Sequence, residues 1–91
     1  MAKIQVNDHQ FYFGESAEEP LALIQFEIQG NILSLLHTEV SSSLKGQGIG
    51  QQLVEYAVEY ARKNQLKIVP VCPFVIRQFE KNPEYNDVKV L

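Results

Sequence analysis

The chain has 91 residues, 45% of them hydrophobic, and eight Lys and Arg stand against eleven Asp and Glu, a formal net charge of −3. A chain of this length supports one hydrophobic core, so we expect a single compact domain over residues 1–91. The acidic balance lacks the basic stripe that binding to a phosphate backbone requires, which argues against nucleic acid as a partner.

The sequence also indicates the cellular compartment in which we expect the protein. Its single cysteine, Cys72, excludes an internal disulfide. The opening Met-Ala-Lys-Ile-Gln-Val lacks the apolar stretch of a signal peptide, and no segment approaches the ~18 apolar residues that span a bilayer. We therefore expect a cytoplasmic protein without membrane contact.

The N-terminal segment up to Val40 is typical of β-strands separated by turns. Its apolar stretches are Ile4 and Val6, Phe11 to Phe13, Leu21 to Ile28, and Ile32 to Val40. The turn residues between them are Asn7-Asp8, Gly14 to Pro20 and Gly30-Asn31. Since Gly30-Asn31 separates two apolar stretches, it favours a hairpin, and the whole segment predicts an antiparallel meander.

From Gly48 to about Asn64 the apolar period becomes helical. The apolar face consists of Ile49, Leu53, Ala57, Tyr60 and Ala61, with Val54 and Val58 beside it, and Tyr56 and Tyr60 are expected in the core. Arg62 and Lys63 suit the negative end of a helix, and we expect Asn64 to adopt the left-handed cap conformation.

A short strand and a second helix follow. Lys67 to Val71 is short, contains β-branched residues and is bounded by Gln65 and Pro73, which predicts a buried strand. Pro73 suits the first turn of a helix that ends near Asn82, before Pro83. A helix between adjacent strands implies a parallel crossover. The predicted fold class is α/β (α+β), a mixed sheet with an antiparallel meander followed by a β-α-β-α unit.

The segment from Lys45 to Gly50, Lys-Gly-Gln-Gly-Ile-Gly, lies where the first helix begins. The first amides of a helix lack internal partners and attract anions, and glycine lets a phosphate approach the backbone. The segment fits neither a P-loop nor a dinucleotide fingerprint, whose third glycine would fall at Gln51. The alternatives are an ordinary turn and, for Lys45, a solvated side chain.

This segment resembles the signature of the GNAT superfamily of N-acetyltransferases: Arg or Gln, two residues, Gly, one residue, then Gly or Ala. Lys45 stands at the first position, and Gly48 and Gly50 match the glycines. Lysine keeps the charge but loses the planar fork of arginine. Further segments resemble a minimal, single-domain subfamily, over about residues 20 to 88: His37-Thr38-Glu39-Val40, Val71-Cys72-Pro73-Phe74 and Asn82-Pro83-Glu84-Tyr85.

The resemblance implies that acetyl-CoA binds where two strands separate, with its pyrophosphate on the glycine segment and its thioester between Val40 and Cys72. No metal ion is implied. The cofactor-binding residues that it predicts are Glu39, Val40, Lys45, Gly46, Gln47, Gly48, Ile49, Gly50, Gln51, Pro73 and Phe74. For Phe74, as for Phe79, the alternative is a place in the core.

Three residues are candidates for catalysis. His37 and Glu39 alternate along one strand, and we expect them on the same face as Leu33 and Leu35, where either can accept a proton from an amine. Cys72 precedes Pro73 at the cap of the second helix, where the dipole favours a thiolate. It can accept the acetyl group or protonate the departing thiol. The alternatives are structural roles for all three.

Many GNAT enzymes use a tyrosine on this helix as the acid, but Phe74 to Asn82 contains none, and Tyr85 is better explained by packing. The resemblance thus implies an acetyl-CoA-dependent N-acetyltransferase. Its partner is an amine, either a small molecule or the lysine or N-terminus of a protein, and the chain is expected to be a monomer or weak dimer. The alternatives are a non-catalytic acyl-CoA-binding or sensing module and an interaction domain that retains only the fold.

Overall fold

The computed structural model describes residues 4–16, 18–44 and 46–90. Its elements in chain order are β1 (Ile4–Val6), β2 (Gln10–Phe13), β3 (Ala22–Gln29), β4 (Ile32–Val40), the 3-10 turn η1 (Ser42–Leu44), α1 (Ile49–Lys63), β5 (Lys67–Pro70), α2 (Pro73–Lys81) and the 3-10 turn η2 (Pro83–Asp87). The expected order of four strands, helix, strand and helix is therefore confirmed.

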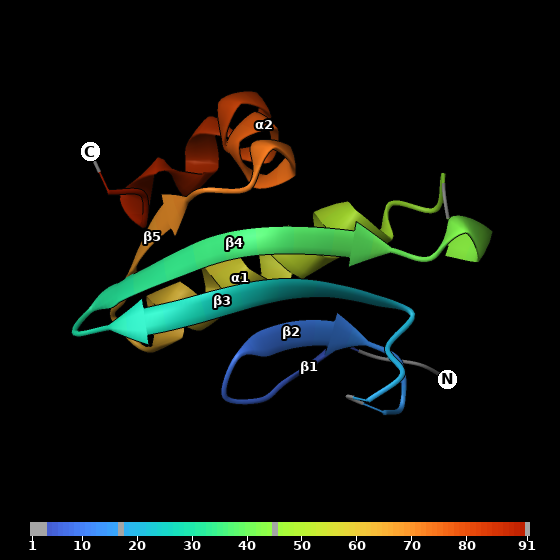
Figure 1. The fold of residues 1–91 in the computed structure, drawn as a ribbon. Helices are drawn as coiled ribbons and strands as arrows, with labels where there is room; N and C mark the ends of the chain where they lie inside the picture. Colours follow the sequence, from blue (N-terminus) through green and yellow to red (C-terminus); the bar gives the residue numbers. More distant parts are fainter. Residues whose placement is uncertain (1–3, 17, 45, 91) are drawn as a thin grey trace.

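The strands form one sheet in the order β1-β2-β3-β4-β5 (Figure 1). The first four are antiparallel neighbours, and β5 runs parallel to β4. Gly30, with φ of 61°, allows the tight turn between β3 and β4. The expected mixed sheet, antiparallel first and parallel at one junction, is confirmed.

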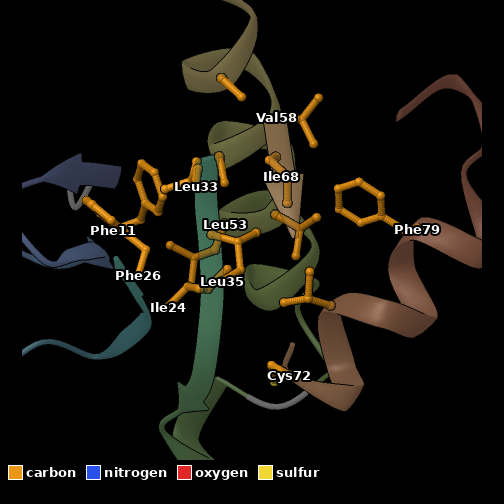
Figure 2. Close-up of a cluster of buried hydrophobic side chains, with 14 of the residues drawn as sticks. Phe11, Ile24, Phe26, Leu33, Leu35, Leu53, Val58, Ile68, Cys72 and Phe79 are labelled. Atoms are coloured by element: carbon orange, nitrogen blue, oxygen red, sulfur yellow. The ribbon is translucent and has the colours of Figure 1, made fainter. Parts of the chain in front are cut away.

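Helix α1 covers one face of this sheet, and Figure 1 shows it passing behind β3 and β4. Leu53, Val54, Ala57, Val58 and Ala61 of α1 are fully buried. They meet side chains from four strands, partly drawn in Figure 2, namely Phe11, Ile24, Leu33, Leu35 and Ile68. No helix formed by the described residues has the length and apolar character needed to cross a membrane.

Aromatic packing extends this core at both ends. Tyr56 and Tyr60 of α1 meet the ring of Phe11 edge-on, with centroids 5.7 and 5.3 Å away. At the other end Phe79 meets Tyr85 at 5.5 Å. Phe79 is only 3% exposed, so the expected core roles of these aromatic side chains are confirmed.

Helix α2 and the tail close the edge of the sheet beside β5. The helix begins at Pro73 and is capped at its end by Asn82, as expected. After η2 the chain returns along β5, because the Ile68 N–H donates to the Val88 carbonyl at 2.6 Å and the Val90 N–H donates to the Ile68 carbonyl at 2.9 Å. These bonds satisfy backbone groups of β5 that would otherwise form an open edge.

Arg62 ties the end of α1 to this tail. Its Nε and Nη2 atoms each donate to a carboxylate oxygen of Asp87 at 2.9 Å, and Nη2 also donates to the Glu84 carbonyl at 2.9 Å. The hydrogen bond from Arg62 holds the pKa of Asp87 below its ordinary value. Arg62 thus joins two elements in addition to its favourable position at the negative end of α1.

The left-handed residue after α1 is Gln65, with φ of 58°, whereas Asn64 has φ of −104°. The prediction for Asn64 was therefore wrong by one position. The Gln65 N–H donates to the Arg62 carbonyl at 3.4 Å and the Leu66 N–H donates to the Ala61 carbonyl at 2.8 Å, the two bonds of a Schellman motif. This bonding pattern fixes the position of the left-handed residue.

Replacing Gln65 with glycine tests this assignment. The left-handed conformation costs an L-residue about 1–2 kcal/mol. Glycine avoids this cost but loses more chain entropy on folding, which offsets part of the gain. We expect Gln65→Gly to raise the free energy of unfolding by about 0.5–1 kcal/mol in urea titrations. The matched change Gln52→Gly, inside α1, should lower it by about 1 kcal/mol. Equal losses for both variants would contradict the assignment.

Candidate functional site

Strand β4 contains one extra residue at Leu36. Gln25 of β3 pairs with His37, but its neighbour Phe26 pairs with Leu35, so Leu36 has no residue opposite it. Such a β-bulge reverses the alternation of the strand beyond it. Leu33 and Leu35 are buried before the bulge, while His37 and Glu39 are exposed after it.

The expectation that His37 and Glu39 share a face with Leu33 and Leu35 is therefore wrong. The residues that turn toward the helices after the bulge are Thr38 and Val40. Counting alternate positions along the sequence fails here because a single added residue leaves no mark in the apolar pattern.

The pairing of β4 with β5 stops beside the bulge, at Leu35 and Pro70. The N–H groups of Val71 and Cys72 both donate to the Leu35 carbonyl, at 3.0 and 3.1 Å. Beyond this point β4 continues to Val40 while the chain from β5 turns into α2 (Figure 1). The two parallel strands separate at their carboxyl ends.

The separated part of β4 presents main-chain groups to this gap. The Ser41 N–H donates to the Leu21 carbonyl of the neighbouring chain at 2.8 Å. Since ladder bonds alternate along an antiparallel pair, residues 37, 39 and 41 direct their groups toward β3. Thr38 and Val40 therefore direct their N–H and C=O groups away from β3, toward the side that β5 has left.

A pocket of about 320 Å³ lies between the end of β4 and the start of α1. It is lined by Thr38, Val40, Leu44, Gly46, Gly48, Ile49, Gly50, Gln51 and Phe74. None of these residues is acidic, and the first turn of α1 contains no acidic residue. The positive end of the α1 dipole therefore faces the pocket without a carboxylate to neutralise it.

Each glycine of the segment has a structural reason. Gly46 and Gly48 have φ of 83° and 73°, conformations that other residues rarely adopt. Gly50 is in α1, and a Cβ there would lie 2.8 Å from Cζ of Phe74. The alternative of an ordinary turn thus explains Gly46 and Gly48, and close packing against the start of α2 explains Gly50.

The first amides of α1 precede the hydrogen bonds within the helix. The first bond within the helix runs from the Gln52 N–H to the Gly48 carbonyl, at 3.1 Å. The N–H groups of residues 49–51 precede it and cannot reach a carbonyl four residues earlier inside the helix. They lie at the pocket, because all three residues line it. Their arrangement suits an anion.

Cys72 caps α2 at the inner end of the gap, as predicted, and Figure 2 shows it at the start of that helix, beyond Leu35. It is 7% exposed, and its Sγ atom lies 3.4 Å from Oγ1 of Thr38. Burial by itself raises the pKa of the Cys72 thiol. The Thr38 hydroxyl and the amides of Val75 and Phe74 outweigh it, and the pKa lies below its ordinary value.

His37 and Glu39 form an exposed pair on the other face of β4. Nε2 of His37 lies 3.2 Å from Oε2 of Glu39, and the two side chains are 55% and 63% exposed. Neither lines the pocket. Glu39 borders a separate acidic hollow together with Glu18 and Glu19. The structure brings these two residues to each other, but it does not bring them to Cys72.

The predicted cofactor residues divide into three groups. Those that line the pocket are Val40, Gly46, Gly48, Ile49, Gly50, Gln51 and Phe74, and those that lie outside its lining are Glu39, Gln47 and Pro73. Lys45 lies outside the described residues. Sequence reasoning missed Thr38 and Leu44, although Thr38 belongs to the segment that carries the resemblance. No group of His, Cys, Asp and Glu side chains suited to a metal ion occurs among the described residues.

Comparisons with known proteins agree with this architecture. Residues 10–88 match the family model of the GCN5-related N-acetyl-transferase. Protein NATD1 of Gallus gallus and of Mus musculus is 30% identical over 63 residues, 68% of this chain. The matched region is 57% of each relative's length, so this chain corresponds to little more than half of those proteins.

Two solved structures share the fold. The NMR structure of a GCN5-like protein from Staphylococcus aureus, to which N-acetyltransferase activity is attributed, has a TM-score of 0.80 and 37% identity over 97% of this chain and 87% of that one. The ribosomal-protein-S18-alanine N-acetyltransferase of Escherichia coli has a TM-score of 0.65 over 85% of this chain and 53% of that one. At 16% identity, the second shows the fold alone.

The mixed sheet, the separated parallel strands and the glycine-rich start of α1 define the class of GNAT-type transferases. Within that class, the chain belongs to the GCN5-related N-acetyl-transferase family.

The contact between Gly50 and Phe74 is testable by a double-mutant cycle. We expect Gly50→Ala to lower the free energy of unfolding when Phe74 is present, because the added methyl group displaces the ring. In a Phe74→Ala background the same change should be neutral or stabilising, since alanine favours the helix. Urea titrations should give a coupling of about 0.5–3 kcal/mol. An equal effect in both backgrounds would overturn the contact.

Proposed function

We propose that this protein transfers an acetyl group from acetyl-CoA to an amine. The observation that carries the proposal is the pocket between the separated end of β4 and the start of α1. It combines the amides of the first turn of α1, which suit a pyrophosphate, with an apolar passage between strands that suits a pantetheine arm. Membership of the acetyltransferase family supports the same ligand.

In this proposal the amides of residues 49–51, with those of the segment that begins at Lys45, hold the pyrophosphate. The pantetheine amides pair with the main-chain groups of Thr38 and Val40, which face the gap. The thioester then lies between Val40 and Cys72, beside the wall formed by Phe74. Two helix N-termini converge there, because Phe74 at the start of α2 touches Gly50 at the start of α1.

Transfer to an amine also requires a group that takes a proton from the acceptor. His37 and Glu39 lie on the open face of β4, across the strand from Thr38 and Val40. An acceptor that approaches from this face passes the His37–Glu39 pair before it reaches the thioester. We propose this pair as the base, acting directly or through water.

A second function is favoured by one feature of the pocket. Its lining contains no His, Asp, Glu, Tyr or Cys side chain. A chain that binds acyl-CoA without transferring the acyl group, as a sensor does, needs only this lining. The experiments below separate the two functions.

Acetyl-CoA should stabilise the protein in thermal melts. At about a hundred times its dissociation constant, a ligand that binds only the folded state adds about 2.7 kcal/mol to the free energy of unfolding. We expect a rise of several degrees in the melting temperature, also with coenzyme A itself. An unchanged melting temperature at millimolar acetyl-CoA overturns both the enzyme and the sensor.

A matched pair of variants tests the position of the pyrophosphate. Gln51→Glu adds a negative charge at the pocket, whereas Gln52→Glu adds the same charge to a neighbouring exposed position outside its lining. Both charges favour the start of a helix, so stability should not fall. We expect calorimetry to show about tenfold weaker coenzyme A binding for Gln51→Glu, less at high salt, and little change for Gln52→Glu. Equal affinities would refute the position.

Catalysis is tested by the release of free coenzyme A thiol in the presence of amines. We expect turnover with one class among small amines, lysine peptides and peptides with a free N-terminus. Glu39→Gln together with His37→Ala should lower this turnover by about 10²-fold and leave the acetyl-CoA-dependent rise in melting temperature unchanged. Binding without turnover for every amine would favour the sensor.

A further inference from the structure

Thr38 links Cys72 to the pocket. It is one of the residues that line the pocket, and its Oγ1 atom lies 3.4 Å from the Cys72 Sγ atom. Cys72 itself is 7% exposed and does not contribute to the lining. Of these two residues, only Thr38 is in contact with the pocket.

This position results from the bulge at Leu36. Without the extra residue, the side chain of residue 38 would point to the opposite face of β4 from Leu35. With it, Thr38 faces the start of α2, where Cys72 occupies the cap position. The hydroxyl and the thiol come from residues 34 positions apart, and only the tertiary fold brings them together.

A hydroxyl in this place can connect two sulfur atoms. It accepts a hydrogen bond with its oxygen and donates one with its own proton at the same time. When the Cys72 S–H donates to Oγ1, as in the structure, the Thr38 O–H can donate to a different acceptor. In the proposed function, that acceptor is the sulfur of departing coenzyme A.

We propose that Thr38 relays a proton from the Cys72 thiol to the sulfur of departing coenzyme A, an inference that rests on the proposed acetyl transfer. The amine nitrogen forms its bond to the acetyl carbon, and the bond from that carbon to sulfur breaks. The Thr38 O–H protonates the released sulfur while Oγ1 takes the proton of Cys72. The amine nitrogen gives its proton to the proposed His37–Glu39 base, which releases it to solvent, and Cys72 takes one proton from solvent before the next turnover, so that the protons balance.

The same geometry argues against direct attack by the cysteine. An acetyl-cysteine would require the Cys72 sulfur to reach the thioester carbon, but Cys72 is 7% exposed and is not among the residues that line the pocket, whereas Thr38 is. Proton transfer through the hydroxyl does not require the sulfur to reach that carbon. Burial by itself raises the pKa of the thiol, but once the proton has left, the Thr38 hydroxyl and the first amides of α2 can donate to the thiolate, and they hold the pKa below its ordinary value, which makes the thiol a better proton donor.

The contact is first tested without acetyl-CoA. Cys72 is the only cysteine of the sequence, so its alkylation by iodoacetamide can be followed by mass spectrometry of the intact protein across a pH series. Thr38→Val removes the hydroxyl at constant shape, and Thr38→Ser keeps it. We expect the midpoint of the rate against pH to move upward in Thr38→Val and to return in Thr38→Ser. Identical midpoints in all three proteins overturn the contact, and the relay with it.

The relay is then tested by the rate of thiol release with an accepted amine. We expect Thr38→Val to lose about 10²-fold in kcat, with a nearly unchanged KM for acetyl-CoA, and Thr38→Ser to stay within a few-fold of wild type. Cys72→Ala should lose as much, and the double variant no more than either single one, because both changes interrupt one path. Melting curves with acetyl-CoA confirm that each variant folds and binds.

The outcomes distinguish a failure of the relay from a failure of the proposed acetyl transfer. If wild type releases thiol with an accepted amine and Thr38→Val does so at the same rate, the relay is wrong and the proposed acetyl transfer is unaffected. If the two losses multiply in the double variant, the residues act independently and the relay is again wrong. If wild type binds acetyl-CoA but turns over no amine, the proposed transfer fails and the relay falls with it. Acetylated Cys72 in a single turnover would replace the relay by covalent catalysis.

Discussion

The bulge at Leu36 is the constraint on which the site depends. It occurs where the pairing of β4 with β5 ends. The last residues of β4 therefore differ from the earlier ones in two ways: which side chains face the helices, and what the main-chain groups on the β5 side face. Thr38 and Val40 turn toward the helices, and their backbone groups face the gap. His37 and Glu39 are left on the open face. One added residue thus divides the end of the strand into two chemically different sides.

The second organising feature is the meeting of two helix N-termini at this gap. Helix α1 begins at a left-handed glycine and α2 begins at Cys72 followed by proline. The contact between Gly50 and Phe74 fixes how closely they approach. Partial positive charge from both helices therefore gathers beside the pocket. It favours an anion at the start of α1, and at the start of α2 it stabilises negative charge on sulfur.

A few residues at this site each serve two purposes. Gly50 is both a packing residue and part of the pocket, and Phe74 is both its neighbour and a wall of that pocket. Among the described residues, no helix covers the front of β3 and β4 in Figure 1, so the His37–Glu39 side of β4 stays open to solvent.

The order of the elements, the mixed sheet and the place of the glycine segment could be predicted from the sequence, because these follow from local periodicity, turn residues and proline positions. The sequence also placed Cys72 at a helix cap, since Pro73 marks the first turn. It failed by one residue at Gln65, where the bonding of the Schellman motif and not the residue type chose the left-handed position. It failed again along β4, where it placed His37 and Glu39 with the buried leucines. Only the tertiary structure decided that face, because a bulge arises from the match between two strands, and only the tertiary structure brought Thr38 against Cys72.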